Sequence, residues 1–292
     1  MRKRMPPNTP NRTARGPWSA HRGARPRFKT TAALLHSLRR KGESVTVQLL
    51  NVEISDISMT ELLEKRSGTF LTLHTNMLGK LQKDRGFYEL LPRFDFVTCD
   101  SQVLCIAAKW ILGTPVPERV SGSDYFGKFC ERYRDDPTMT IFLCGAMPGV
   151  AEKAAARINA RAGRQLVVGT YSPPIGFERD EAEVQRILDA ITVSGATALL
   201  VGLGTPKENH FIMRHRADLP TVQLFLPLGG TIDYEAGEVK RPPAWVTRAG
   251  LEWMYRLLQN PGQRARRYLL EDPPMLAQLV RQRLGRYRDP FA

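Results

Sequence analysis

Short apolar segments alternate with segments of helical periodicity along most of this chain, and this alternation constrains the fold most strongly. The apolar segments are rich in aromatic and β-branched residues, as buried strands are. We expect strands at 44–54, 69–74, 94–99, 139–144, 165–171, 197–203 and 222–226. We expect helices at 31–41, 58–68, 76–85, 101–110, 123–135, 149–162, 180–193 and after 206. Strands that alternate with helices predict an α/β fold with a doubly wound, mostly parallel, Rossmann-like sheet.

The two ends of the chain depart from this pattern. Residues 1–30 are rich in Arg, Pro and Gly and contain no acid, which predicts a disordered basic tail. Residues 31–234 form the predicted α/β core, and 235–292 form a predicted helical, arginine-rich appendage. The net charge of +14 is concentrated in these two ends. Such ends favour a polyanionic partner, either nucleic acid or an anionic membrane surface.

Several classes of protein are disfavoured by what the sequence lacks. No apolar run approaches the roughly 20 residues of a membrane-spanning helix, and no apolar segment follows the basic N-terminus as in a signal peptide. The cysteines have no CxxC spacing and predict buried thiols in a reducing cytoplasm: Cys99, Cys105, Cys130 and Cys144. The sequence contains none of the metal-binding motifs HxH, HExxH and DxD, so we expect no bound metal. Asp233 and Glu235 are the nearest approach to a DxD pair.

Asp100 stands on the turn between the expected strand 94–99 and the helix that follows it. In parallel α/β sheets, ligands bind at the carboxyl ends of the strands. A carboxylate in this position can act as a base, bind a sugar hydroxyl, or cap the helix. His74 ends the expected strand 69–74, close to Thr72. A lone histidine is more often structural than a ligand, so its role stays open at this point.

Three glycine-containing turns follow other strands at the same expected edge of the sheet. The turn at 142–149 suits phosphate approach at a helix N-terminus, although a tight turn needs the same residues. The turn at 201–209 also fits a helix that begins at proline, with glutamate favourable in its first turn. The loop at 229–233 follows the last strand. With Asp100 they predict a ligand cleft, whose candidate binding residues are Gly145, Pro148, Gly149, Gly202, Gly204, Lys207, Glu208, Gly230 and Asp233.

These turns belong to a longer series of ordered motifs between about 45 and 270. The motifs lie at 72–74, 97–100, 118–124 (ERVSGSD), 142–149 (FLCGAMPG), 200–207 (LVGLGTPK), 229–233 (GGTID), 236–243 (AGEVKRPP) and 250–256 (GLEWMYR). In this order they resemble the WecG/TagA/CpsF family of bacterial glycosyltransferases, glycosyltransferase family 26. Its members add a sugar from a nucleotide donor to a polyprenyl-diphosphate-linked acceptor during synthesis of surface polysaccharides.

The resemblance implies inverting, metal-independent transfer from a UDP-sugar, with no cofactor beyond this donor. Asp100 would be the general base that takes a proton from the acceptor hydroxyl. Thr72 would hold the reacting sugar or the developing charge, and His74 would contact donor or acceptor. The basic C-terminal region would bring Arg256, Arg264 and Arg267 to the diphosphate. The protein would work in the cytoplasm, peripherally on the inner face of the plasma membrane, with a homo-oligomer possible.

Three departures from the family pattern leave the sugar and the acceptor open. His74 stands where the family usually has Asn, and Cys99-Asp-Ser101 stands where it has Pro-Asp-Gly. Glu208-Asn209 replaces the usual Gln-Glu pair. An inactive relative is therefore one alternative. The other is an α/β protein whose basic ends bind nucleic acid, although the sequence lacks a recognised nucleic-acid motif.

Overall fold

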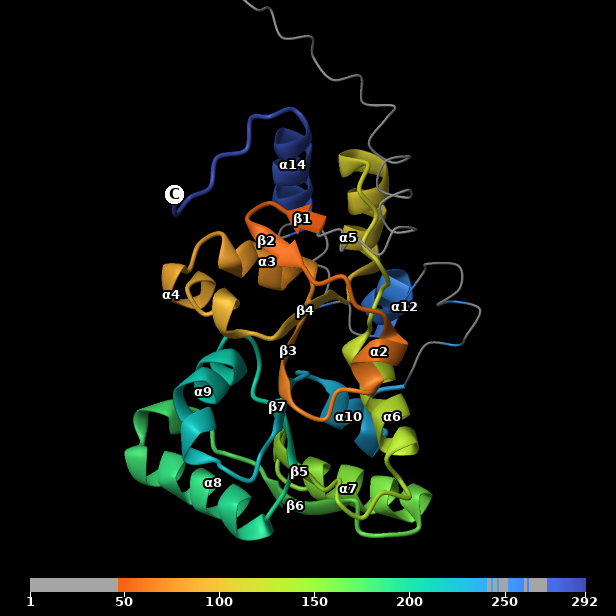
Figure 1. Cartoon of the computed structure of the whole chain (residues 1–292), viewed down its shortest axis with the longest axis vertical. Coiled ribbons are helices and arrows are strands. Elements are labelled where there is room, and N and C mark those ends of the chain that lie inside the picture. The colour runs from red at the N-terminus through yellow and green to blue at the C-terminus, as the bar shows by residue number, and fades with distance from the viewer. Residues whose placement is uncertain (1–46, 241–242, 244–245, 247–251, 260–261, 263–271) are drawn as a thin grey trace, which may run out of the picture.

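The computed structural model describes residues 47–240, 243, 246, 252–259, 262 and 272–292 (Figure 1). The expected basic tail and the expected helix at 31–41 lie outside the described residues. The strands are β1 Val47–Leu49, β2 Val52–Ile54, β3 Gly68–Leu73, β4 Phe96–Cys99, β5 Ile141–Gly145, β6 Val167–Tyr171, β7 Ala198–Gly202 and β8 Leu224–Pro227.

Helices connect the strands and continue into the C-terminal segment. The α-helices are α2 Met59–Leu63, α3 Thr75–Leu81, α4 Arg85–Tyr88, α5 Gln102–Ala107, α6 Gly122–Arg132, α7 Val150–Ala162, α8 Glu181–Ser194, α9 Lys207–His215, α10 Thr231–Ala236, α12 Glu252–Gln259 and α14 Asp272–Arg283. A π-helical turn, η3 Ala108–Leu112, extends α5. Short 3₁₀ turns are η2 Leu91–Arg93, η4 Phe177–Arg179 and η5 Arg216–Asp218.

Six strands form one parallel sheet in the order β4-β3-β8-β7-β5-β6, which confirms the predicted doubly wound fold. The helices α2, α6, α7 and α10 pack on one face of the sheet, whereas α8 and α9 pack on the other (Figure 1). The β1–β2 hairpin, α3, α5 and α14 surround the β4 edge. Each face is therefore covered, as continuous apolar strands such as β5 require.

The segment 44–54, predicted as one strand, is a two-stranded antiparallel hairpin over its described part. Leu50 has a φ of 58°, and it forms with Asn51 the turn that reverses the chain. Val47 and Leu49 on β1 and Val52 and Ile54 on β2 are buried, while the central residue of each strand is exposed. The turn is only two residues long and apolar residues stand on both sides of it, which is why the segment was predicted as a single strand.

Two expected helices also differ in extent. The capping box of Ser58 and Glu61 opens α2 as predicted, but the helix ends at Leu63 and not near Gly68, which begins β3. The expected helix at 76–85 is divided into α3 and α4, because Asp84 caps a new helix by accepting from the Phe87 N–H at 3.0 Å. Both changes shorten helices without moving the strand ends.

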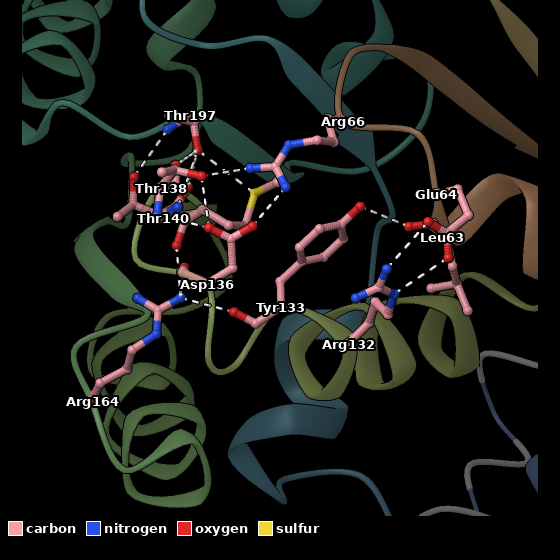
Figure 2. A network of polar contacts seen from close by, with 11 residues as sticks. Leu63, Glu64, Arg66, Arg132, Tyr133, Asp136, Thr138, Thr140, Arg164 and Thr197 are labelled. Carbon is pink, nitrogen blue, oxygen red and sulfur yellow. Dashed lines mark hydrogen bonds and ion pairs between the residues drawn. The ribbon is translucent and has the colours of Figure 1, made fainter.

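A polar network closes the amino-terminal edge of β5 and β7, opposite the strand ends at which ligands bind (Figure 2). Arg164 donates to the backbone carbonyls of Tyr133, Asp136 and Met139 at 2.9, 2.6 and 2.9 Å. Hydrogen bonds from Thr138, and then from Arg66, lower the pKa of the Asp136 carboxyl. One arginine thus ties the end of α6 to the start of the central sheet.

We predict that Arg164→Met lowers the free energy of unfolding by about 1–3 kcal/mol, because it leaves partly buried carbonyls without a donor. Urea unfolding monitored by circular dichroism measures this loss. Arg179→Met, at an exposed arginine of η4, is the matched control and should change stability by less than about 0.5 kcal/mol. Equal stability of the two variants would contradict the role of Arg164.

Candidate active site

A cavity of about 340 Å³ opens at the carboxyl ends of the strands, beside β3. Strand β3 has the next strand of the chain, β4, on one side and the last strand, β8, on the other. The chain connections therefore run in opposite directions from β3. Open α/β sheets bind ligands at the point where the connections diverge in this way. Five residues predicted for the site line this cavity: Thr72, His74, Asp100, Glu208 and Gly230.

Thr72 and Asp100 come from neighbouring parallel strands. Thr72 pairs in register with Thr98, two residues before Asp100. The Asp100 N–H donates to the Leu73 carbonyl at 2.9 Å, which carries the pairing one residue beyond the end of β4. The two predicted catalytic side chains are thus fixed at one edge of the sheet by main-chain hydrogen bonds.

The helix after Asp100 is capped by Ser101. The Leu104 N–H donates to Ser101 Oγ at 3.3 Å, and Ser101 Oγ also lies 3.0 Å from Thr75 Oγ1. The interpretation of Asp100 as the cap of this helix is therefore wrong. The residue that leaves the strand in an extended conformation just before the helix is Ser101, with ψ of 117°. Asp100 lines the cavity instead.

His74 has a structural role and also lines the cavity. It caps α3, because its Nδ1 accepts a hydrogen bond from the Met77 N–H at 3.2 Å. An acceptor at Nδ1 places the proton of a neutral imidazole on Nε2. Asparagine, which the family usually has here, is also a preferred helix cap, so His74 keeps the cap and changes the side chain presented to the ligand.

Glu208 is a buried carboxyl at the second position of α9, with 1% of its surface exposed. Its Oε2 accepts from the Gly204 N–H at 3.1 Å, and its Oε1 accepts from Thr205 Oγ1 at 3.1 Å. Burial raises the pKa of Glu208 to about 7. Glu208 therefore holds the β7–α9 loop while lining the cavity. Its neighbour Asn209 is fully buried and is not among the lining residues.

The glycines at the ends of β5 and β7 allow close contact between backbones. A Cβ on Gly145 would lie 2.3 Å from the Gly202 carbonyl oxygen, and one on Gly202 would lie 2.7 Å from the Gly229 carbonyl oxygen. Packing alone thus requires glycine at 145 and 202. Neither these two nor Pro148, Gly149 and Gly204 are among the lining residues, so their ligand roles stay predictions.

Two charged candidates also lie apart from the cavity lining. Lys207 pairs with Glu178 at 2.5 Å and lines a separate cleft between α9 and η4. Asp233 lies on α10, and partial burial raises the pKa of its carboxyl. Their contacts with a ligand also stay predictions.

The three C-terminal arginines predicted for the site are mostly outside the residues that the structure describes. Arg256 is on α12, but its side chain is not described, and Arg264 and Arg267 lie outside the described residues. The segment does reach the site, because the buried Asp272 at the start of α14 lines the cavity. The predicted approach of the arginines to a diphosphate remains a prediction.

Arg119 is a lining residue to which the sequence reasoning gave no role. Its Nε donates to the Asp100 carbonyl at 2.9 Å, and its Nη1 donates to Gln102 Oε1 at 3.3 Å. Beside it, the Val120 N–H donates to the Cys99 carbonyl at 3.0 Å. Arg119 thus places a cation in the cavity and fixes the turn that carries Asp100. Its position in the motif at 118–124 was the available signal.

The described cysteines are free thiols, of which Cys99, Cys130 and Cys144 are buried and Cys105 is partly exposed. The expectation that all four cysteines are buried is therefore wrong for Cys105. The sulfur atoms of Cys105 and Cys99 are 3.7 Å apart. In the described part of the chain, no group of three His, Cys, Asp or Glu side chains is arranged to hold a metal ion. Metal independence stays a prediction.

We predict that Glu208 makes stability depend on pH. Its folded pKa of about 7 exceeds its ordinary value of 4.5, so the folded protein binds this proton more tightly than the unfolded chain. This contribution to stability is complete below about pH 4.5 and is lost as the pH rises through about 7. Glu208→Gln lacks it, so between pH 5 and pH 8 its stability should rise relative to wild type by about 2–3 kcal/mol.

Urea unfolding of both proteins at the two pH values measures this difference. Glu181→Gln, at an exposed glutamate of α8, is the matched control for the loss of one carboxylate. A stability difference between Glu208→Gln and wild type that does not change with pH would contradict the assignment.

Comparison with known proteins identifies the family of this chain. The sequence model of the glycosyl transferase WecG/TagA/CpsF family matches residues 47–289. The chain is also 31% identical over 205 residues to a Bacillus spizizenii protein named N-acetylglucosaminyldiphosphoundecaprenol N-acetyl-beta-D-mannosaminyltransferase. That alignment covers 70% of this chain and 76% of the relative. The chain therefore belongs to the WecG/TagA/CpsF family and is a glycosyltransferase.

Proposed function

We propose that this glycosyltransferase moves a sugar from a UDP-sugar to a polyprenyl-diphosphate-linked saccharide during synthesis of a bacterial surface polysaccharide. The observation that carries the proposal is the position of Asp100, in a cavity at the strand ends, beside Thr72 and Arg119. The name of the relative supports the class of acceptor, since it describes a sugar transferase acting on a saccharide linked to diphosphoundecaprenol.

In the proposed reaction the Asp100 carboxylate takes the proton of the acceptor hydroxyl. The acceptor oxygen forms a bond to the anomeric carbon as the bond from that carbon to the diphosphate oxygen breaks. UDP leaves on the opposite face of the sugar, so the anomeric configuration inverts. In this proposal Thr72, which is buried and lines the cavity, binds the reacting sugar. The Arg119 guanidinium adds positive charge near the leaving group.

The proposed reaction needs no metal ion to hold the diphosphate. The nearest approach to a metal-binding pair in the sequence was Asp233 with Glu235. Glu235 is buried and pairs with Arg161 on α7, which neutralises its charge. Cations and main-chain donors are left to stabilise the leaving diphosphate. The loop of Gly229 and Gly230 also lines the cavity.

We also propose that the enzyme works peripherally on the inner face of the plasma membrane. The lipid of such an acceptor stays in the bilayer, so the enzyme must come to the surface to reach the saccharide. Within the described residues, no helix combines the length and the apolar character that crossing a bilayer requires. The net charge of +14 supports attraction to anionic lipid.

We predict that Asp100→Asn lowers turnover by about 10²–10⁴-fold, the usual contribution of a general base. Its melting temperature should stay close to that of wild type, because Ser101 caps the helix. Asp95→Asn is a matched control at the opposite end of β4, where its carboxylate accepts from the Thr69 N–H at 2.7 Å. Turnover is measured as UDP release with a lipid-diphosphate acceptor. Near wild-type turnover in Asp100→Asn would rule out the base.

A further inference from the structure

The helix that begins beside Asp100 carries apolar side chains from the cavity to the protein surface. Val103, Ile106 and Trp110 follow one another at intervals of three and four residues, so they share one face of α5 and η3. Val103 lines the cavity, whereas Ile106 is 47% exposed and Trp110 is 75% exposed. The opposite face packs into the core through Leu104, Ala107, Ala108 and Leu112.

The end of α14 lies against the end of η3 and adds a second group of exposed apolar residues. Arg283 Nη1 donates to the Leu112 carbonyl at 3.2 Å, which joins the two elements. Figure 1 shows α5 and α14 at the same end of the molecule. Val280 and Leu284, one helical turn apart, are 42% and 61% exposed. Large apolar side chains are thus exposed on both helices.

Cations accompany these apolar side chains. Lys109 Nζ lies 5.1 Å from the centre of the Trp110 ring, and Arg281 is exposed between Val280 and Leu284. We define the α5–α14 patch as Ile106, Lys109, Trp110, Val280, Arg281 and Leu284. It contains two cations and no acid.

This combination fits an anionic lipid surface. Tryptophan is favoured at the level of the lipid head groups, where its ring is partly buried and partly hydrated. Each basic residue near an anionic membrane contributes about 1 kcal/mol of attraction. Neutral protein partners would match the apolar side chains but would leave the cations without complementary charge.

We propose that the α5–α14 patch docks the enzyme on anionic lipid and turns the mouth of the cavity towards the bilayer. This inference rests on the proposed function, because a lipid-linked acceptor is what gives docking a purpose. Ten residues separate Asp100 from Trp110, which is roughly 15 Å along a helix. A saccharide held at the membrane surface can therefore reach the base while its lipid stays in the bilayer.

Flotation of the full-length protein with vesicles tests the proposal. One set of vesicles contains equal parts phosphatidylcholine and phosphatidylglycerol, and the other contains phosphatidylcholine alone. We expect wild type to float with the anionic vesicles, and to float less as salt is added. Ile106→Asp and Trp110→Ser should each reduce the bound fraction about tenfold, since each loses apolar burial. Circular dichroism confirms that the variants are folded.

Ile175→Asp is the matched control. Ile175 is 97% exposed in the loop after β6, at the far edge of the sheet, and its replacement should leave flotation unchanged. Wild-type flotation of both patch variants would overturn the proposal. So would a wild type that elutes as an oligomer and patch variants that elute as monomers, because the patch would then be a contact between two copies.

Turnover separates this inference from the proposed function. Both patch variants should act on a water-soluble, short-chain acceptor as wild type does, and should lose turnover only on acceptor embedded in vesicles. Equal losses on the two acceptors would contradict a docking role. If wild type floats through the patch but transfers to neither acceptor, the docking surface stands and the proposed acceptor is wrong.

Discussion

The parallel pairing of β3 with β4 is the interaction on which the site depends. It sets Thr72 opposite Thr98, and the hydrogen bond from the Asp100 N–H to the Leu73 carbonyl extends it into the loop. A shift of one residue in this register would turn Thr72 to the other face of the sheet. Arg119 then holds the Asp100 carbonyl, so the carboxylate stands on a turn fixed from both sides.

The departures from the family pattern keep the backbone of the site and change its chemistry. His74 caps α3, Ser101 caps α5, and Glu208 accepts from the β7–α9 loop. These three substituted residues therefore each have a hydrogen-bond partner that explains how the fold tolerates them. In the cavity, however, His74 and Glu208 present an imidazole and an acid where the family usually has two amides. We expect these two residues to determine which sugar this enzyme uses, and to make that sugar differ from the sugars of its relatives.

The sheet and part of the site were predictable because their signals are local. Apolar periodicity located all six strands of the sheet, and the rule for strand ends brought Thr72, Asp100 and Glu208 to one cavity. The β1–β2 turn was missed because it is only two residues long and joins two apolar segments. Contacts between distant segments were also beyond local patterns. Arg119 bonds a carbonyl 19 residues earlier, and the glycine at 145 is required by the backbone at 202.

We propose inverting transfer from a UDP-sugar without a metal ion. It is tested most directly by incubating the enzyme with a panel of UDP-sugars and a short-chain lipid-diphosphate saccharide in the presence of EDTA. Mass spectrometry would identify the product, and NMR would give its anomeric configuration. We expect a product one sugar heavier than the acceptor, with the configuration of the donor inverted. A retained configuration, or transfer that stops with chelator and returns with Mg²⁺, would contradict it.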